Sequence, residues 1–166
     1  MGSTKNYIIA LAILGLILIT SKVNAANIIA EFEGLELEAY KDSANIWTIG
    51  YGNTRNPYTG LPIKQGDKIS KKEALEWLNL TTAGIQSTIK KLVKVKISDK
   101  QLAALTSLAY NIGTGAFSRS TLLRLLNAGE DKKKVAAQFL RWNKVKGVTI
   151  PGLTRRRKLE ADLYLS

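Results

Sequence analysis

Five carboxylate side chains gather between positions 31 and 42, namely Glu31, Glu33, Glu36, Glu38 and Asp42. Two carboxyl groups that flank a glycosidic bond can cleave it, because one protonates the leaving oxygen while the other handles the nucleophile or water. Acidic residues are also typical of the solvated outer face of a helix, and glutamates near a helix N-terminus suit its dipole. The pattern alone leaves both interpretations open and does not identify the acid.

The chain contains no histidine and no cysteine, which limits the chemistry available to it. A Ser-His-Asp triad, a Cys-His nucleophile, a thiolate or imidazole zinc site and a C-x-x-C redox pair cannot be built from this composition. Acid–base chemistry must then come from carboxylates, with lysine, tyrosine or hydroxyl side chains assisting. We therefore expect neither a metal nor another cofactor.

A helix followed by a small sheet is predicted to carry these acids. An apolar residue recurs every three or four positions over residues 27–40, which predicts a helix there. The recurring residues are Ile28, Phe32, Leu35 and Ala39. Residues 42–45 have turn chemistry, and large apolar residues alternate with small ones over residues 46–52, which indicates a strand. We expect residues 41–68 to form a small, hairpin-rich sheet.

The rest of the chain is predicted to be mostly helical. Ser70 with Glu73 and Ser98 with Gln101 have the spacing of capping boxes, and the first is expected to open a helix that runs to about Val93. The other expected boundaries are interruptions at Gly113 and Gly115, a restart at Ser120 or Thr121, a stop at Gly129, and helices over residues 131–142 and 154–165. The predicted fold class is α+β, with one small β-hairpin sheet and a mostly helical body.

The first part of the chain does not read as part of a soluble core. No charged residue occurs between Lys5 and Lys22, and residues 7–20 are almost entirely apolar. Sixteen helical residues would span roughly 24 Å, which is short for a relaxed membrane-spanning helix. The positive start and the sequence Val23-Asn24-Ala25 before Ala26 fit an export signal, although the segment also fits a thin membrane anchor. We therefore divide the chain into residues 1–26, an N-terminal hydrophobic helix, and residues 27–166, the globular domain.

The formal net charge of +12 predicts an anionic partner. The charge is unevenly distributed, because residues 31–60 carry a net charge of −3 whereas residues 101–166 carry +8. The basic run from Arg155 to Lys158 is interpreted first as the solvated face of a helix and second as a contact to an anionic envelope. No helix-turn-helix, zinc-finger or RNA-binding motif accompanies the charge, so nucleic acid is not the expected partner.

Several motifs resemble the phage-lysozyme family, glycoside hydrolase family 24. The family pattern is a glutamate, eight residues, an aspartate, five residues and a threonine, and Glu33, Asp42 and Thr48 meet it without gaps. Further similar stretches follow in order over residues 27–166. They are Glu33-Gly34-Leu35, Tyr40-Lys41-Asp42, residues 47–52, residues 109–113, Gly115-Ala116-Phe117, residues 120–123, Arg141-Trp142 and residues 151–157.

The resemblance implies a lysozyme-like fold and a muramidase that cuts the β-1,4 bond between N-acetylmuramic acid and N-acetylglucosamine in peptidoglycan. Glu33 would be the general acid, which needs a pKa raised by burial, while Asp42 stays ionised and positions water together with Thr48. Such enzymes invert the anomeric centre, which requires carboxyl groups about 6.5–9.5 Å apart. The resemblance also implies a monomer that acts on the cell wall after export, either held at the inner membrane and then periplasmic, or periplasmic after signal cleavage.

Three further residues fall where the family lines its sugar cleft, namely Tyr110, Asn111 and Ser120. Tyr110 fits a core position equally well, and Asn111 fits a turn residue that satisfies local backbone groups. Many relatives have a histidine where this chain has Asn53. We expect that difference to affect the pH dependence of stability rather than turnover.

Alternative functions remain at this point. A lytic transglycosylase also relies on a glutamate acid but has no need of the water-positioning Asp42 and Thr48. A non-catalytic cationic module that binds the wall or nucleic acid would explain the charge without the carboxylates. The hydrophobic segment also resembles the signal-arrest-release segments of some phage relatives, which delay lysis by holding the enzyme in the membrane.

Overall fold

The computed structural model describes residues 24–42 and 44–166. The predicted N-terminal hydrophobic helix, with its apolar residues 7–20, lies outside this described part of the chain. Within the described ranges, no helix has both the length and the apolar character needed to cross a membrane.

The described chain is mostly helical with two short antiparallel hairpins, which confirms the predicted α+β class. The elements follow in the order α2 (Ala25–Glu33), β1 (Glu36–Lys41), β2 (Trp47–Gly50), α3 (Lys71–Leu92), α4 (Asp99–Ile112), α5 (Thr114–Ser118), α6 (Thr121–Asn127), α7 (Lys132–Ala137), the 3-10 helix η1 (Phe139–Trp142), β3 (Lys144–Val145), β4 (Val148–Thr149) and α8 (Pro151–Leu165).

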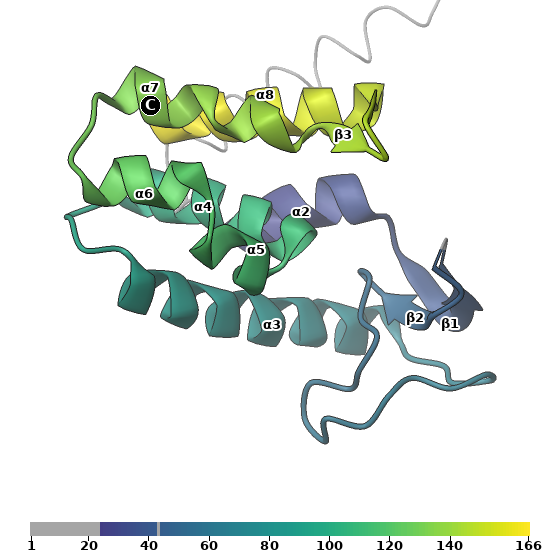
Figure 1. Ribbon diagram of the computed structural model, residues 1–166. Coiled ribbons are helices and arrows are strands. Elements are labelled where there is room, and N and C mark those ends of the chain that lie inside the picture. Colours follow the sequence, from purple (N-terminus) through teal and green to yellow (C-terminus); the bar gives the residue numbers. More distant parts are fainter. Residues whose placement is uncertain (1–23, 43) are drawn as a thin grey trace, which may run out of the picture.

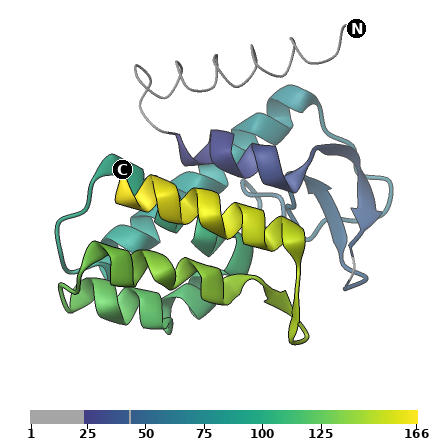
Figure 2. The ribbon, with the colours of Figure 1, turned by 90° about the horizontal axis from the view of Figure 1, so that it is seen from above.

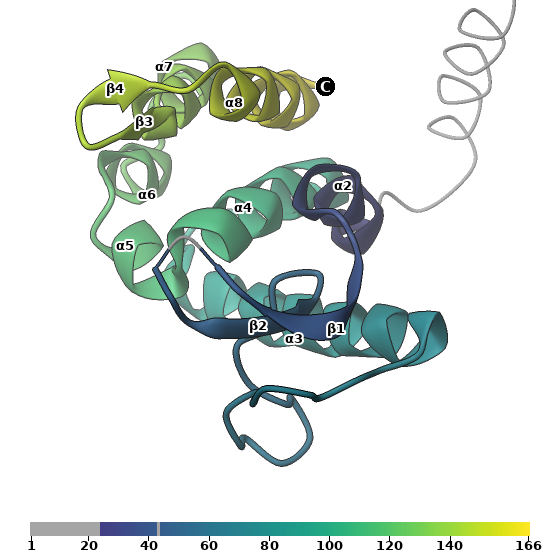
Figure 3. The same cartoon turned by 90° about the vertical axis from the view of Figure 1, so that its right-hand side faces the viewer.

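The β1–β2 hairpin lies at one end of the molecule, and α3 runs from there along its length (Figure 1). Seen from above, α8 crosses the helical body and α2 runs to one side of it (Figure 2), at a lower level than α8 in Figure 1. In the third view, α4 lies between α8 above it and the hairpin below it (Figure 3). The main core fills the helical body around Leu105, Leu108, Phe117 and Phe139, which are fully buried. A second cluster packs Ile29 of α2 against α3 and the turn after β2.

Both predicted capping boxes are present. The Ser70 hydroxyl accepts the Glu73 N–H while the Glu73 side chain accepts the Ser70 N–H, and Ser98 and Gln101 make the same reciprocal pair. The helix opened by Ser70 ends at Leu92 with Val93 as its C-cap, which agrees with the predicted end. These boundaries were predictable because a capping box depends only on residues three positions apart.

The predicted helix over residues 27–40 is wrong in its second half. The helix α2 ends at Glu33, and Gly34 follows with φ +70°, a conformation that glycine adopts easily and that stops the helix. Residues 36–41 form β1 instead, because they pair with β2 in register Tyr40 to Thr48 and Lys41 to Trp47. Tertiary pairing therefore overrides the three-and-four spacing of apolar residues.

Smaller differences occur later in the chain. Of the two glycines predicted to interrupt the helices, Gly113 does so between α4 and α5, whereas Gly115 lies inside the short helix α5. The predicted helix over residues 131–142 is divided into α7 and η1. The last helix begins at Pro151, where a missing N–H is tolerated, rather than at residue 154. The β3–β4 hairpin was not predicted; its turn is Lys146-Gly147, both with positive φ.

Candidate active site

Glu33 is the last residue of α2, and its carboxylate forms an ion pair with a residue of α8. Its Oε1 lies 2.6 Å from Nη1 of Arg156, and the two side chains are 21% and 4% exposed. Burial of Ile29 fixes α2 against α3 and so fixes the end of the helix from which Glu33 extends. The carboxylate is therefore held in one place while part of it remains accessible.

Asp42 and Thr48 are positioned by the β1–β2 hairpin. Oδ1 of Asp42 accepts the backbone N–H groups of Ala44 and Ile46, each at 2.9 Å. The Thr48 side chain is buried, and its Oγ1 donates to the carbonyl oxygen of Ile46 at 3.1 Å. Both predicted residues are thus anchored to the same loop, and the two groups lie at neighbouring positions of the hairpin.

The hairpin also places Tyr40 within the electrostatic influence of both Asp42 and Glu33. Burial raises the pKa of Tyr40, and the negative charges of Glu36, Asp42 and Glu33 raise it further. The charges of both predicted carboxylates, Glu33 and Asp42, therefore act on Tyr40, which pairs with Thr48 across the hairpin. Asp42 and Thr48 therefore lie on the hairpin, and Glu33 lies at the end of the helix that precedes it.

The turn after β2 passes close to the Glu33 carboxylate. Gly52 has φ +93°, and a Cβ atom built on it would lie 3.8 Å from Oε2 of Glu33. Gly50 also has a positive φ, and a Cβ there would lie 3.3 Å from Cδ1 of Ile69. Glycine at these positions allows the left-handed backbone and the close approach of the turn to the acid.

Two of the predicted cleft residues lie beside Glu33. Tyr110 donates its hydroxyl to the carbonyl oxygen of Tyr51 at 2.6 Å, and burial followed by the charge of Glu33 raises its pKa. Asn111 is exposed, and its Oδ1 accepts from Nη2 of Arg157 at 3.1 Å. Glu33 and Asn111 line a cavity of about 320 Å³, whereas the other predicted site residues, Asp42, Thr48, Tyr110 and Ser120, are not among its lining residues. This cavity is the candidate active site.

The side chains of Ser120 and Asn53 form hydrogen bonds away from this cavity, and a second cavity lies elsewhere. The Ser120 hydroxyl caps α6 by accepting the N–H of Leu123, and the residue is 7% exposed. Asn53 is buried, and its side-chain amide donates to Oγ1 of Thr81 at 3.3 Å. A larger cavity of about 380 Å³ lies against Ile49, Ile63 and Trp77, and none of the predicted site residues lines it.

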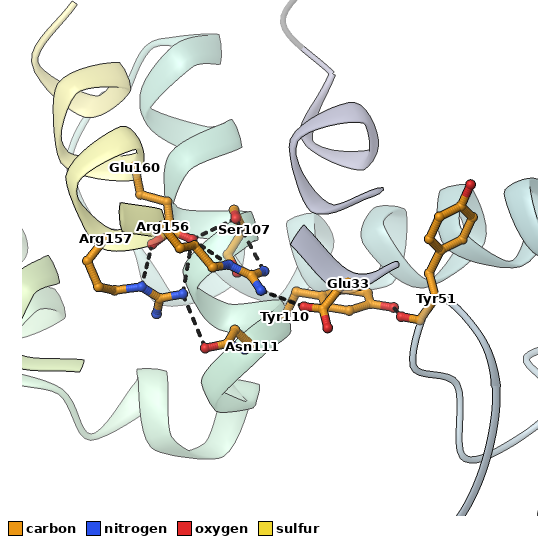
Figure 4. A network of polar contacts seen from close by, with 8 residues as sticks. All are labelled: Glu33, Tyr51, Ser107, Tyr110, Asn111, Arg156, Arg157 and Glu160. Carbon is orange, nitrogen blue, oxygen red and sulfur yellow. Dashed lines mark hydrogen bonds and ion pairs between the residues drawn. The ribbon is translucent and has the colours of Figure 1, made fainter. Parts of the chain in front are cut away.

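The interpretation of the Arg155–Lys158 run as a solvated face is wrong for two of its residues. Arg156 and Arg157 are 3% and 0% exposed, and both pair with the fully buried Glu160 (Figure 4). Burial lowers the pKa of Arg157 to about 10 and raises the pKa of Glu160, so pairing must offset the loss of hydration. The spacing of Glu160 from the two arginines, four and three residues, is the local signal that was missed.

The chain is similar to a known protein family and to several phage proteins. The family model described as "Phage lysozyme" matches residues 30–160. The chain is 37% identical over 143 residues to an endolysin of Acyrthosiphon pisum secondary endosymbiont phage 1, covering 84% of this chain and 93% of the relative. It is 37% identical over 133 residues to the SAR-endolysin of Enterobacteria phage P21, covering 80% of this chain and 77% of the relative.

A solved structure is similar over most of its length. The endolysin from Escherichia coli O157:H7 phage FAHEc1 superimposes with a TM-score of 0.77 at 41% identity, covering 89% of this chain and 94% of that one. The chain spans only about half the length of the endolysin of Bacillus phage B103, of which it covers 52%.

Proposed function

We propose that this chain, which belongs to the phage lysozyme family and is a glycosidase, hydrolyses the β-1,4 bond between N-acetylmuramic acid and N-acetylglucosamine in peptidoglycan. This hydrolysis would lyse bacterial cells. One observation carries the proposal most directly. The Glu33 carboxylate lies part-exposed in a cavity beside the turn that contains Gly52, and this turn follows directly from the hairpin that carries Asp42 and Thr48. Two carboxylates of this kind are the equipment of glycoside hydrolysis.

Glu33 acts as the general acid in the proposed reaction. It gives its proton to the glycosidic oxygen as the bond to the anomeric carbon breaks, and it is left as a carboxylate. Arg156, at 2.6 Å, stabilises that carboxylate once it has formed. The arginine thus acts on the state of Glu33 that follows proton donation.

Asp42 and Thr48 position the attacking water on the opposite side of the sugar. Oδ1 of Asp42 is already held by two N–H groups, so Oδ2 is the oxygen that accepts the water proton. Oγ1 of Thr48 donates to Ile46, so its lone pairs accept a second hydrogen bond from the same water. Attack from this side inverts the anomeric configuration.

Substrate contacts are proposed for Tyr110, Asn111 and Ser120. Asn111 is exposed beside Glu33, and its amide N–H groups are available because Oδ1 is the atom that pairs with Arg157. The Tyr110 hydroxyl is used by Tyr51, so the tyrosine would contact sugar through its ring. The proposal for Ser120 rests on the family resemblance alone, since its hydroxyl caps α6.

We also propose an exported enzyme that is tethered to the inner membrane through residues 7–20 until release or cleavage. The SAR-endolysin of phage P21 among the relatives supports this order of events. Mass spectrometry of the exported protein distinguishes the two routes. An intact N-terminus supports release, whereas a chain that begins at Ala26 supports cleavage.

Substitution of Glu33 by glutamine tests the proposed activity. The variant should retain its circular dichroism spectrum and lose lysis of chloroform-treated Gram-negative cells, because glutamine cannot donate the proton. Lysis by folded Glu33→Gln would contradict the proposal and favour a non-catalytic cationic module. Product analysis provides the second arm. Reducing ends are expected, whereas 1,6-anhydro-muramic acid ends would identify a lytic transglycosylase.

A further inference from the structure

We propose that Glu160 is a positioning residue for this reaction, which holds Arg156 in the orientation that places and balances Glu33. The inference rests on the proposed function. It concerns a residue that lies on α8, outside the family spacing pattern that selected Glu33, Asp42 and Thr48. Glu160 is fully buried, so it acts through Arg156 and makes no contact with substrate.

The Glu160 carboxylate is surrounded by donors from two helices (Figure 4). Oε1 accepts from Oγ of Ser107 at 2.6 Å and from Nε of Arg156 at 3.1 Å. Oε2 pairs with Nε of Arg157 at 3.0 Å. The carboxylate therefore joins α4 to α8 and is fixed against movement from either helix.

Arg156 is held on several edges of its guanidinium group. Nε contacts Glu160, Nη2 donates to the carbonyl oxygen of Ser107 at 3.1 Å, and Nη1 contacts Glu33 at 2.6 Å. The guanidinium carbon also lies 5.3 Å from the ring centre of Phe32, the neighbour of Glu33. Because the guanidinium is planar and rigid, fixing Nε and Nη2 determines where Nη1 points. Glu160 and Ser107 therefore set the position of the Arg156 guanidinium, and this position directs Nη1 at the Glu33 carboxylate.

The four charges also form a balanced set. Two buried arginines, Arg156 and Arg157, face two carboxylates, Glu33 and Glu160. Neutralising Glu160 would leave two adjacent cations with Glu33 as the remaining anion of the set. Arg156 would then favour the ionised form of Glu33 more strongly, and the protonated form that donates to the glycosidic oxygen would become harder to reach.

Several charged or titratable groups lie around Glu33 and can influence the pH dependence of the reaction. They are Arg156 from α8, Tyr110 from α4, Tyr40 from the hairpin, and Glu31 and Arg155 from the walls of the same cavity; Asp42 acts in turn on Tyr40. Glu160 reaches Glu33 only through Arg156. Neutralising Glu160 should therefore shift the alkaline limb of the pH–rate profile to lower pH.

The experiment measures kcat, KM and the pH–rate profile of Glu160→Gln on soluble peptidoglycan oligomers. Asp162→Asn is the matched control, because it removes one negative charge from an exposed position on the same helix. We expect kcat of Glu160→Gln to fall about 10- to 100-fold, as for a misplaced catalytic group, with KM changed less than about twofold. The alkaline limb should move to lower pH, whereas Asp162→Asn should behave as the wild type.

Glu160→Gln removes a buried ion and can prevent folding, so Ser107→Ala is the second variant. It removes the 2.6 Å hydrogen bond to Glu160 and the longer one, at 3.5 Å, that the Ser107 hydroxyl accepts from Nη2 of Arg156, and it should show the same changes in smaller degree. A folded variant with wild-type kcat and pH profile would overturn the inference. Reduced kcat that follows the unfolded fraction, with an unmoved alkaline limb, would also overturn it by showing a purely structural role. If the wild type itself releases no reducing ends, the proposed function fails instead.

Discussion

Tyr110 donates its hydroxyl to the carbonyl oxygen of Tyr51 at 2.6 Å, and this bond joins α4 to the turn that follows β2. The turn contains Gly52, which lies next to Glu33. The helical body and the hairpin are therefore connected at the point where the candidate acid and its neighbours meet. Through this hydrogen bond, the well-packed helix α4 fixes the position of the turn that follows β2.

Replacement of Tyr110 by phenylalanine should remove this link while keeping the ring. We expect a loss of about 1 kcal/mol in the free energy of unfolding, because a part-buried hydrogen bond is lost. Turnover should fall modestly, since the turn beside Glu33 becomes less fixed. Urea unfolding and a lysis assay measure the two effects. Unchanged stability would show that the hydrogen bond is not formed in solution.

Two substitutions of Asp42 can separate its role in holding the hairpin from its proposed role in accepting the proton of the water. Asparagine keeps an Oδ1 that accepts the N–H groups of Ala44 and Ile46, so Asp42→Asn should retain the hairpin. It cannot accept the proton of the water, and turnover should fall by about 100-fold or more. Asp42→Ala should lose both the activity and the two hydrogen bonds. Equal activity of Asp42→Asn and the wild type would remove Asp42 from the proposed mechanism.

Gly52→Ala tests the close approach of the turn to the acid. Its φ of +93° makes any side chain strained, by about 1–2 kcal/mol, and its new methyl group would lie 3.8 Å from Oε2 of Glu33. Gly66→Ala is the control, because Gly66 has φ +84° and no atom within 4 Å of the added Cβ. Both variants should lose stability to a similar degree. Only Gly52→Ala should lose activity per folded molecule, because its methyl group would contact Oε2 of Glu33 and cover part of the carboxylate, and equal losses in both would argue against this effect.

The capping box at the start of α3 makes a pH-dependent contribution to stability. The backbone N–H of Ser70, followed by its hydroxyl, lowers the pKa of Glu73 below the ordinary value of 4.5. The unfolded chain therefore binds more protons than the folded chain between these two pKa values. The contribution is complete above about pH 4.5 and is lost as the pH falls through the folded pKa.

Glu73→Gln provides the measurement, because glutamine keeps the capping geometry but does not titrate in this range. Wild type should be more stable than the variant at pH 7, and the difference should shrink towards pH 3. Urea unfolding at several pH values gives this difference directly. A difference that stays constant from pH 7 to pH 3 would be inconsistent with an ionised cap.

Features that depend on near neighbours in the chain could be predicted from the sequence. The capping pairs Ser70–Glu73 and Ser98–Gln101 lie three residues apart, and the structure contains both. The strand around Trp47 was also predictable from its alternation of large and small residues. The end of α2 was not, because residues 36–41 become a strand only when β2 is present to pair with them.

The surroundings of the candidate acid were less predictable than the acid itself. Spacing and family resemblance selected Glu33, Asp42 and Thr48, and the hairpin places the last two on one loop. The cation that pairs with Glu33 is Arg156, which lies 123 residues further along the chain. A run of four basic residues reads locally as an exposed surface, since burial of Arg156 and Arg157 depends on Glu160 and on α4.

The first turn of α2 has a consequence for the order of events during maturation. Ala25 and Ala26 are 0% and 1% exposed, and Asn24 caps the helix by accepting the N–H of Ala26. A peptidase needs an extended, accessible backbone, which folded α2 does not offer at this bond. If the proposed cleavage between Ala25 and Ala26 takes place, it must therefore precede docking of α2 into the domain. On the proposed cleavage route, folding and processing at this bond would compete in time, and the faster one would determine which N-terminus the active enzyme carries.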